Sequence, residues 1–183
     1  MLFRSAPIAD LYKTQVYALA RYLNREVYGR ELIPGNLMDG SVVPSAELSE
    51  AQDVTKGLGD PIKYGYHDAL LRQLIEYRHH GADILGWFLD GTLLDAIEWP
   101  HVDEFRGYFS DATSWLDDLE WVTGQLRGSY FKRIQAPPII VVSKRAFGFD
   151  LRESQLPDYT PNIYYERRQK VLASALEVAI GTS

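Results

Sequence analysis

Cysteine is absent from the 183 residues of the chain. This absence excludes disulfide bonds, thiolate zinc sites and a cysteine nucleophile, and it suits a reducing compartment or a particle assembled inside a cell. Long apolar runs are absent as well: the longest, 136–142, is far shorter than the ~20 residues that span a bilayer. The first residues also lack the apolar core of a secretory signal peptide. We therefore expect no contact with a membrane and no secretion through such a signal.

Basic residues are too few for a phosphate-binding surface. The chain has 19 lysines and arginines against 25 acidic residues, a net charge of −6. Proteins that bind nucleic acid through its phosphates need a dense basic face, so this balance argues against a nucleic-acid partner. The hydrophobic fraction of 46% and the charged fraction of 24% are those of a globular protein, which argues against wholesale disorder.

Aromatic residues are plentiful, at 13% of the chain with twelve tyrosines and four tryptophans. Tyrosine has a wide apolar face and one polar tip, so it is favoured where a surface is buried against another chain. A small core filled with aromatic side chains would give the same composition. Both interpretations stay open.

The hydrophobic pattern predicts a mainly α-helical chain, with five to six helices in an irregular bundle, one small β-hairpin and an extended arm. Three parts are expected: an N-terminal helix at 1–29, the arm at 30–60, and a helical core with the β element at 61–183. In the N-terminal helix, Pro7 suits the first turn and Gly29 ends the helix. Its apolar stripe recurs every three or four residues: Tyr12, Val16, Leu19, Leu23 and Val27.

Residues 30–60 are interrupted by glycine or proline every few positions and keep neither a helical nor a strand period. A connection this long without structure of its own is uncommon in a compact domain. Its apolar content is too high for a solvated linker, because exposed apolar surface favours contact with another surface. We therefore expect the arm to dock on neighbouring subunits through its apolar side chains, which are Ile33, Leu37, Met38, Val42, Val43 and Leu48.

Further helices are expected over 60–81, 83–99, 110–126 and 160–181. The first opens with Asp60 and Pro61 and ends at Gly81, and the second divides into two short helices at Asp90 and Gly91. Between the last two, the β-branched run 139–142 predicts a strand, with 146–149 as its hairpin partner. The last helix is expected to bury a stripe made of Tyr165, Leu172, Leu176 and Ile180.

One short motif, from Phe88 to Asp95, resembles the first motif of the haloacid-dehalogenase-like phosphatases, which read Asp-x-Asp-Gly-Thr after a buried strand. The resemblance implies a phosphoryl nucleophile two residues before Asp90 and a magnesium site beside it. Phe88 occupies the nucleophile's position, and a phenyl ring can neither attack phosphorus nor bind Mg²⁺. No alternating strand–helix pattern follows for a parallel sheet. Asp90, Gly91 and Thr92 are more simply a turn followed by a helix cap.

The remaining candidates for chemistry are histidines. His79 and His80 stand at a helix end, where they can bond unpaired carbonyl groups. His67 follows the helical pattern beside an aspartate, and His101 has no metal-ligand spacing around it. The chain contains no GxGxxG or GxxxxGK[ST] loop and no GxSxG elbow, which are the usual phosphate-binding and serine-nucleophile motifs. We accordingly predict no catalytic residue, no cofactor and no metal site.

These observations favour a non-enzymatic structural subunit of a large protein assembly. The absence of cysteine, the many tyrosines and the broken apolar arm are typical of bacteriophage virion components of the neck, tail or connector region. In this interpretation the chain forms a homo-oligomer, contacts other protein subunits, and is found in the virion or the cytoplasm. The alternative is a small soluble intracellular enzyme, hydrolase-like, with a cleft near His67, Asp90 or His101.

Overall fold

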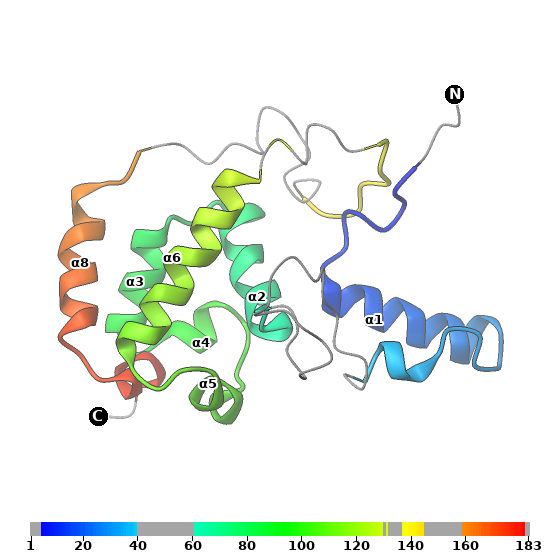
Figure 1. Ribbon diagram of the computed structural model, residues 1–183, viewed down its shortest axis with the longest axis horizontal. Coiled ribbons are helices and arrows are strands. Elements are labelled where there is room, and N and C mark those ends of the chain that lie inside the picture. The colour runs from blue at the N-terminus through cyan, green and yellow to red at the C-terminus, as the bar shows by residue number, and fades with distance from the viewer. Residues whose placement is uncertain (1–4, 40–60, 130, 132–136, 145–158, 182–183) are drawn as a thin grey trace. The chain divides into compact units, whose positions relative to one another are not determined.

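The computed structural model describes residues 5–39, 61–129, 131, 137–144 and 159–181 (Figure 1). The chain is divided into two compact units. The small unit comprises Tyr12–Tyr64, and the helical unit combines Met1–Leu11 with Gly65–Ser183. The three-part organisation expected from the sequence stays a prediction.

Helices make up nearly all regular structure in the described ranges, so the mainly α-helical fold is confirmed. The small unit contains α1 (Lys13–Tyr22), a π-helical turn η1 (Leu23–Val27) and a 3₁₀ turn η2 (Gly35–Leu37). The helices of the helical unit begin with α2, although the first residue of α2, Tyr64, belongs to the small unit. Its elements are α2 (Tyr64–Ile75), α3 (Gly81–Leu89), α4 (Leu93–Ala96), α5 (Val102–Tyr108), α6 (Ala112–Gly128), α8 (Asn162–Leu172) and the 3₁₀ turn η6 (Leu176–Ile180).

In the small unit, side chains of the first helix hold the segment that follows it. The side-chain oxygen of Asn24 accepts hydrogen bonds from the backbone N–H groups of Leu32 and Ile33, and its amide donates to the Ile33 carbonyl at 2.7 Å. The guanidinium of Arg21 donates to the Met38 carbonyl at 2.8 Å. The first part of the predicted arm is therefore fastened to its own unit, and the rest, 40–60, lies outside the described residues.

The first helix differs from the prediction at its end and on its stripe. The α-helix ends at Tyr22, and a π-helical turn continues it to Val27 before Gly29, which adopts a φ of 60°. Of the predicted apolar stripe, Tyr12 is buried, whereas Leu19 and Val27 are exposed. The apolar spacing predicted a helix correctly, because helix formation depends on local geometry. It did not predict which side chains are buried, because a stripe is buried only where another surface packs against it.

The core of the helical unit is built from α2, α3 and α6. Helix α2 buries a stripe made of Tyr66, Leu70 and Leu74, and α6 buries Trp115 and Leu119. Helix α3 is apolar almost all round and is central, since it contacts α4, α8 and η6. Figure 1 shows α8 running beside α3 and α6.

Helix α2 ends six residues earlier than predicted. It stops at Ile75, and Arg78 takes a left-handed φ of 62°. The N–H of His79 then donates to the Gln73 carbonyl at 3.0 Å, which folds the chain back onto the last turn of α2. Gly81, the predicted stop, instead begins α3.

The break predicted between two short helices is confirmed at Gly91. α3 ends at Leu89 and α4 begins at Leu93. Gly91 has a φ of 69°, and an added Cβ would lie 2.8 Å from the Cα of Gly181. The chain therefore needs glycine at this position for both its conformation and its close contact with the C-terminal turn.

The C-terminal helix is shorter than predicted, and its buried face is different. α8 ends at Leu172, and the 3₁₀ turn η6 replaces its last predicted turns. Of the predicted stripe, Leu176 is buried and Ile180 is partly buried against the core, whereas Tyr165 and Leu172 are exposed; Val171, outside the stripe, is fully buried. The break rotates η6 relative to α8, so a single 3.6-residue period cannot describe both segments.

The predicted β-hairpin is not confirmed, because the described residues contain no strand. Ile139 makes one isolated parallel bridge with Ala6. The backbone N–H groups of Val142 and Ser143 donate to the carboxylate of Asp10, so a side chain accepts the bonds that a partner strand would. The predicted second strand, 146–149, lies outside the described residues. Within the described part, no helix is both long and apolar enough to cross a membrane.

Candidate functional site

A buried polar pair joins α2 to α6. Nε2 of His67 lies 2.9 Å from Oδ2 of Asp118, and the two side chains are 2% and 9% exposed. The His67 ring also lies against Trp121, with ring centroids 5.8 Å apart. Asp118 follows Trp115 by three residues, which places it at the edge of the buried stripe of α6.

A second buried bond lies next to the first. The indole N–H of Trp115 donates to the hydroxyl oxygen of Tyr66 at 2.8 Å, and both side chains are fully buried. The Tyr66 ring makes edge contacts with Phe105 and Phe109. Burial, together with the nearby charge of Asp118, raises the pKa of the Tyr66 phenol far above its ordinary value. Tyr66 therefore stays protonated, and the two bonds fix the position of α2 on α6.

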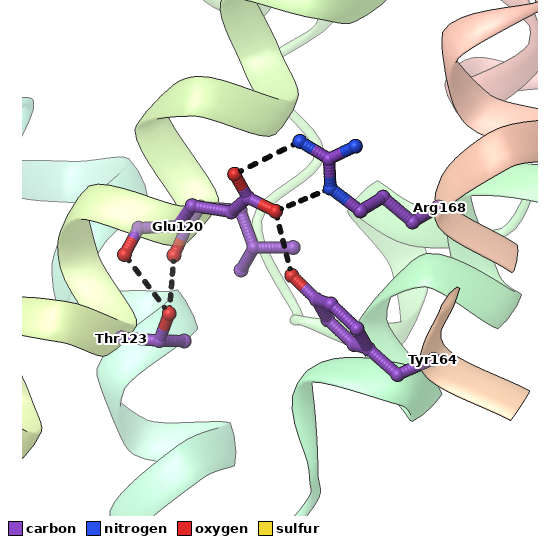
Figure 2. Close-up of polar contacts among 5 residues, drawn as sticks. Glu120, Thr123, Tyr164 and Arg168 are labelled. Carbon is purple, nitrogen blue, oxygen red and sulfur yellow. Dashed lines mark hydrogen bonds and ion pairs between the residues drawn. The ribbon is translucent and has the colours of Figure 1, made fainter. Parts of the chain in front are cut away.

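The third polar group joins α8 to α6 (Figure 2). The Glu120 carboxylate accepts hydrogen bonds from Nε of Arg168 at 2.7 Å and from the hydroxyl of Tyr164 at 3.0 Å. The hydrogen bond from Arg168 and that from Tyr164 hold the pKa of Glu120 below its usual value. Burial and the Glu120 charge raise the pKa of Tyr164. Thr123, beside this group in Figure 2, donates its proton to the backbone carbonyls of Leu119 and Glu120.

The turn between α2 and α3 borders a pocket of about 150 Å³. Its wall combines two arginines, two histidines, one glycine, one threonine and one leucine. These residues are Leu74, Arg78, His79, His80, Gly81, Thr123 and Arg127. Positive side chains therefore meet here from the turn and from the last turn of α6.

The three residues of the predicted enzyme cleft lie in different surroundings, and none lines this pocket. His67 is buried against Asp118. Asp90 is the exposed residue that caps the end of α3. His101 is exposed, with Nδ1 3.2 Å from a carboxylate oxygen of Glu104. His80 was predicted to bond carbonyl groups at the end of a helix; it instead caps the start of α3, where its Nδ1 accepts a hydrogen bond from the Ala82 N–H at 3.1 Å.

The predicted docking residues of the arm are only partly within the described ranges. Leu37 is 49% exposed, Ile33 is half-buried and Met38 is buried. Val42, Val43 and Leu48 lie outside the described residues. Docking through these side chains stays a prediction.

The phosphatase-like motif does not follow a strand. Phe88 lies in α3, fully buried, with its ring 4.3 Å from that of Trp115. Asp90 and Gly91 form the turn after the helix, as the simpler interpretation predicts. In the described part of the chain, no three histidine, cysteine, aspartate or glutamate side chains lie together so that they could hold one metal ion.

Sequence reasoning missed Asp10, Asp118, Arg78 and Arg127. Asp10 is buried and accepts hydrogen bonds from the backbone N–H groups of residues 142 and 143. The signal for Asp118 is its spacing from Trp115. Neither arginine gives a sequence signal, because isolated arginines are common on helix surfaces.

Comparison with known proteins gives a family. A model of the family described as NAD synthase matches residues 3–98. The NH(3)-dependent NAD(+) synthetase of Chlorobium phaeobacteroides (strain BS1) is 37% identical over 91 residues, which are 50% of this chain and 28% of the relative. The Glutamine-dependent NAD(+) synthetase of Xanthomonas campestris pv. campestris (strain 8004) is 31% identical over 147 residues, 80% of this chain and 21% of the relative. The Glutamine-dependent NAD(+) synthetase of Thermotoga maritima is 33% identical over 147 residues, which are 80% of this chain and 20% of the relative. No solved structure matches the chain.

These matches overturn the predicted function. They point to an enzyme, so the expectation of a non-enzymatic bacteriophage subunit in a virion is wrong, and the hydrolase-like alternative is wrong as well. The broken apolar segment that suggested a docking arm lies inside the matched residues. The chain spans between a fifth and little more than a quarter of the length of these relatives. Because the model of the NAD synthase family covers just over half of its residues, the chain belongs to that family.

Proposed function

We propose that this chain works as the helical part of a glutamine-dependent NAD(+) synthetase. The observation that carries the proposal is the length of the matches. The ammonia-dependent relative aligns over 91 residues, whereas the glutamine-dependent relatives align over 147. In a chain of 183 residues, an alignment of 147 residues has to include everything from α2 to α6.

The structure supports treating this longer region as one folding unit. The family model ends at residue 98, but Tyr66 and His67 before that point bond to Trp115 and Asp118 after it. The hydrophobic core contains buried residues from before and from after residue 98. An alignment that extends across α6 therefore includes both partners of each of these hydrogen bonds.

The chain covers about a fifth of the glutamine-dependent relatives, so the proposal assigns it a part of the enzyme. The test is a chimera in which this chain replaces the matching segment of the Thermotoga maritima enzyme. The chimera is produced in a bacterial strain whose own NAD(+) synthetase is depleted, and growth and cellular NAD(+) are measured. The matched control is the same enzyme with the segment deleted.

We expect the chimera to restore NAD(+) and growth, and the deletion control to restore neither. The purified chimera is expected to form NAD(+) with glutamine as the nitrogen source. A chimera that folds, as shown by its tryptophan fluorescence, yet forms no NAD(+) with glutamine or with ammonium would contradict the proposal.

A further inference from the structure

Helix α8, which lies beside α3 and α6 (Figure 1), has little apolar packing of its own. Among the residues of α8, all of which the structure describes, Val171 alone is buried. The helix has 11 residues, and an isolated helix of that length is marginal in water, because most helices in proteins are stabilised by packing of an apolar face. The polar contacts of its side chains therefore have a large share in keeping α8 in place.

These polar contacts lie in the first two turns of α8 (Figure 2). The Glu120 carboxylate on α6 accepts hydrogen bonds from the Tyr164 hydroxyl at 3.0 Å and from Nε and Nη2 of Arg168 at 2.7 and 3.3 Å. Nη1 of Arg167 donates to the Ala82 carbonyl of α3 at 2.6 Å. One carboxylate thus binds two side chains of α8 at once.

The part of α3 that α8 covers is formed by small residues. A Cβ added at Gly81 would lie 3.3 Å from a ring carbon of Tyr164, and one added at Gly86 would lie 2.9 Å from Nη1 of Arg167. Side chains of α8 therefore lie directly on the α3 backbone. Because glycine has no side chain to bury, this contact removes less apolar surface from water than a contact between large side chains would.

Opposite charges add to the attraction between α8 and α6. α8 has three basic residues and one acidic residue, whereas α6 has three acidic residues and one basic residue. The hydrogen bond to Glu120 raises the pKa of Arg168, and the charge of Asp117 acts in the same direction. The Arg168 and Glu120 side chains are 30% and 34% exposed, so dissolved salt weakens this attraction.

The other end of α8 is anchored in the core. Leu176 and Ala179 of η6, which follows α8, belong to the hydrophobic core. The backbone of Gly181 lies against that of Gly91. Between α8 and η6, residues 173–175 are two alanines and a serine. Apolar packing therefore fixes the chain just after α8, whereas polar bonds hold the first two turns of the helix.

We propose that α8 is a strap that opens as a unit about residues 173–175, while η6, α2, α3 and α6 stay folded. Proteins open locally in contiguous units of this kind, at a lower free energy than global unfolding requires. Opening separates Tyr164 and Arg168 from Glu120, and it uncovers α3 at Gly81 and Gly86. The Glu120 carboxylate therefore controls how often this side of α3 is exposed.

The test is hydrogen exchange of the backbone amides, followed by NMR on the full ¹⁵N-labelled chain with increasing urea below the unfolding transition. Glu120→Gln keeps the shape of the side chain and removes its charge. The matched control is Glu98→Gln, because Glu98 also binds an arginine, Arg72, at 2.8 Å, away from α8. If Glu120→Gln does not fold, Tyr164→Phe replaces it, because that variant removes one bond to Glu120 and keeps the ring.

A further variant separates local opening from global unfolding. Tyr66→Phe weakens the bond between α2 and α6, which stays formed when only the strap opens. It should therefore speed exchange of those α6 amides that exchange through global unfolding and leave the α8 amides unchanged.

In the wild-type chain, we expect the α8 amides to exchange faster than those of α6 and to respond less to urea, because local opening exposes less surface. Glu120→Gln is expected to speed α8 exchange about fivefold, the effect of one partly exposed charged hydrogen bond. Glu98→Gln should leave α8 exchange unchanged. Equal exchange and equal urea response in α8 and α6 would overturn the proposal. An α8 rate that Tyr66→Phe raises as much as the α6 rate, or that Glu120→Gln does not raise, would overturn it as well.

Discussion

Tyr66→Phe is expected to destabilise the helical unit, although the substitution removes only one oxygen atom. Both Tyr66 and Trp115 are fully buried, and the indole N–H donates to the phenol oxygen at 2.8 Å. Phenylalanine keeps the ring contacts with Phe105 and Phe109. The loss is therefore confined to the hydrogen bond.

The size of the loss in stability is set by the polar group that the substitution leaves buried without a partner. The indole N–H stays buried without its acceptor, and an unsatisfied buried donor costs about 1–3 kcal/mol. Trp115→Phe removes the same bond but also shortens a large side chain, so its cost includes a cavity. In the double variant no polar atom of the pair is left, and the coupling energy between the two sites is expected to be about 0.5–3 kcal/mol.

The assay is urea unfolding followed by tryptophan fluorescence. All four tryptophans of the chain lie in the helical unit, so the signal reports that unit alone. Free energies of unfolding are measured for the wild-type chain, both single variants and the double variant. A Tyr66→Phe variant within about 0.3 kcal/mol of wild type, together with additive single effects, would refute the reasoning.

Three further predictions concern other contacts. Glu120→Gln is expected to lower the free energy of unfolding by about 1 kcal/mol at pH 7, since the bond from Glu120 to Arg168 is partly exposed. Because the pKa of Glu120 is lowered in the folded chain, this difference from wild type should hold above about pH 5 and vanish as the pH falls through that pKa. An equal difference at pH 7 and pH 3 would contradict the prediction. Asp10→Ala is expected to lower the free energy of unfolding by about 1–3 kcal/mol. It should also speed the hydrogen exchange of the Val142 and Ser143 amides, which donate to the Asp10 carboxylate. Unchanged exchange would show that those bonds do not form in solution. Gly91→Ala is expected to destabilise the chain by more than about 1 kcal/mol, because Gly91 has a left-handed φ and lies against the backbone of Gly181. Gly124→Ala, inside α6 with open space around it, should instead stabilise the chain by about 0.5–1 kcal/mol. Equal shifts of the melting temperature in the two variants would contradict this prediction.

Helix positions could be predicted from the sequence because they depend on local spacing and caps. The break between α3 and α4 followed from the turn residues Asp90 and Gly91. The end of α2 could not be predicted, because Arg78 adopts the conformation that sequence rules assign to glycine. The predicted hairpin failed for a long-range reason: the 142–143 backbone bonds to Asp10, far back in the chain.

The polar pairs of the core were not predictable from local pattern. His67 and Asp118 are 51 residues apart, and the sequence showed each only as a polar residue on a helix. The function was predicted wrongly for a related reason. Apolar residues between glycines and prolines indicate that a segment packs against something, but they do not say whether the surface is another subunit or the same enzyme.

The boundary of the family match does not coincide with a boundary of the fold. The match ends at residue 98, between α4 and α5, but the helical unit continues to its C-terminal residues. Ending the chain there would remove Trp115 and Asp118, the partners of Tyr66 and His67. It would also expose the faces of α2 and α3 that α6 and α8 bury. Within this chain, the matched residues of the helical unit from Gly65 to Glu98 therefore depend for their folding on helices that lie beyond the match.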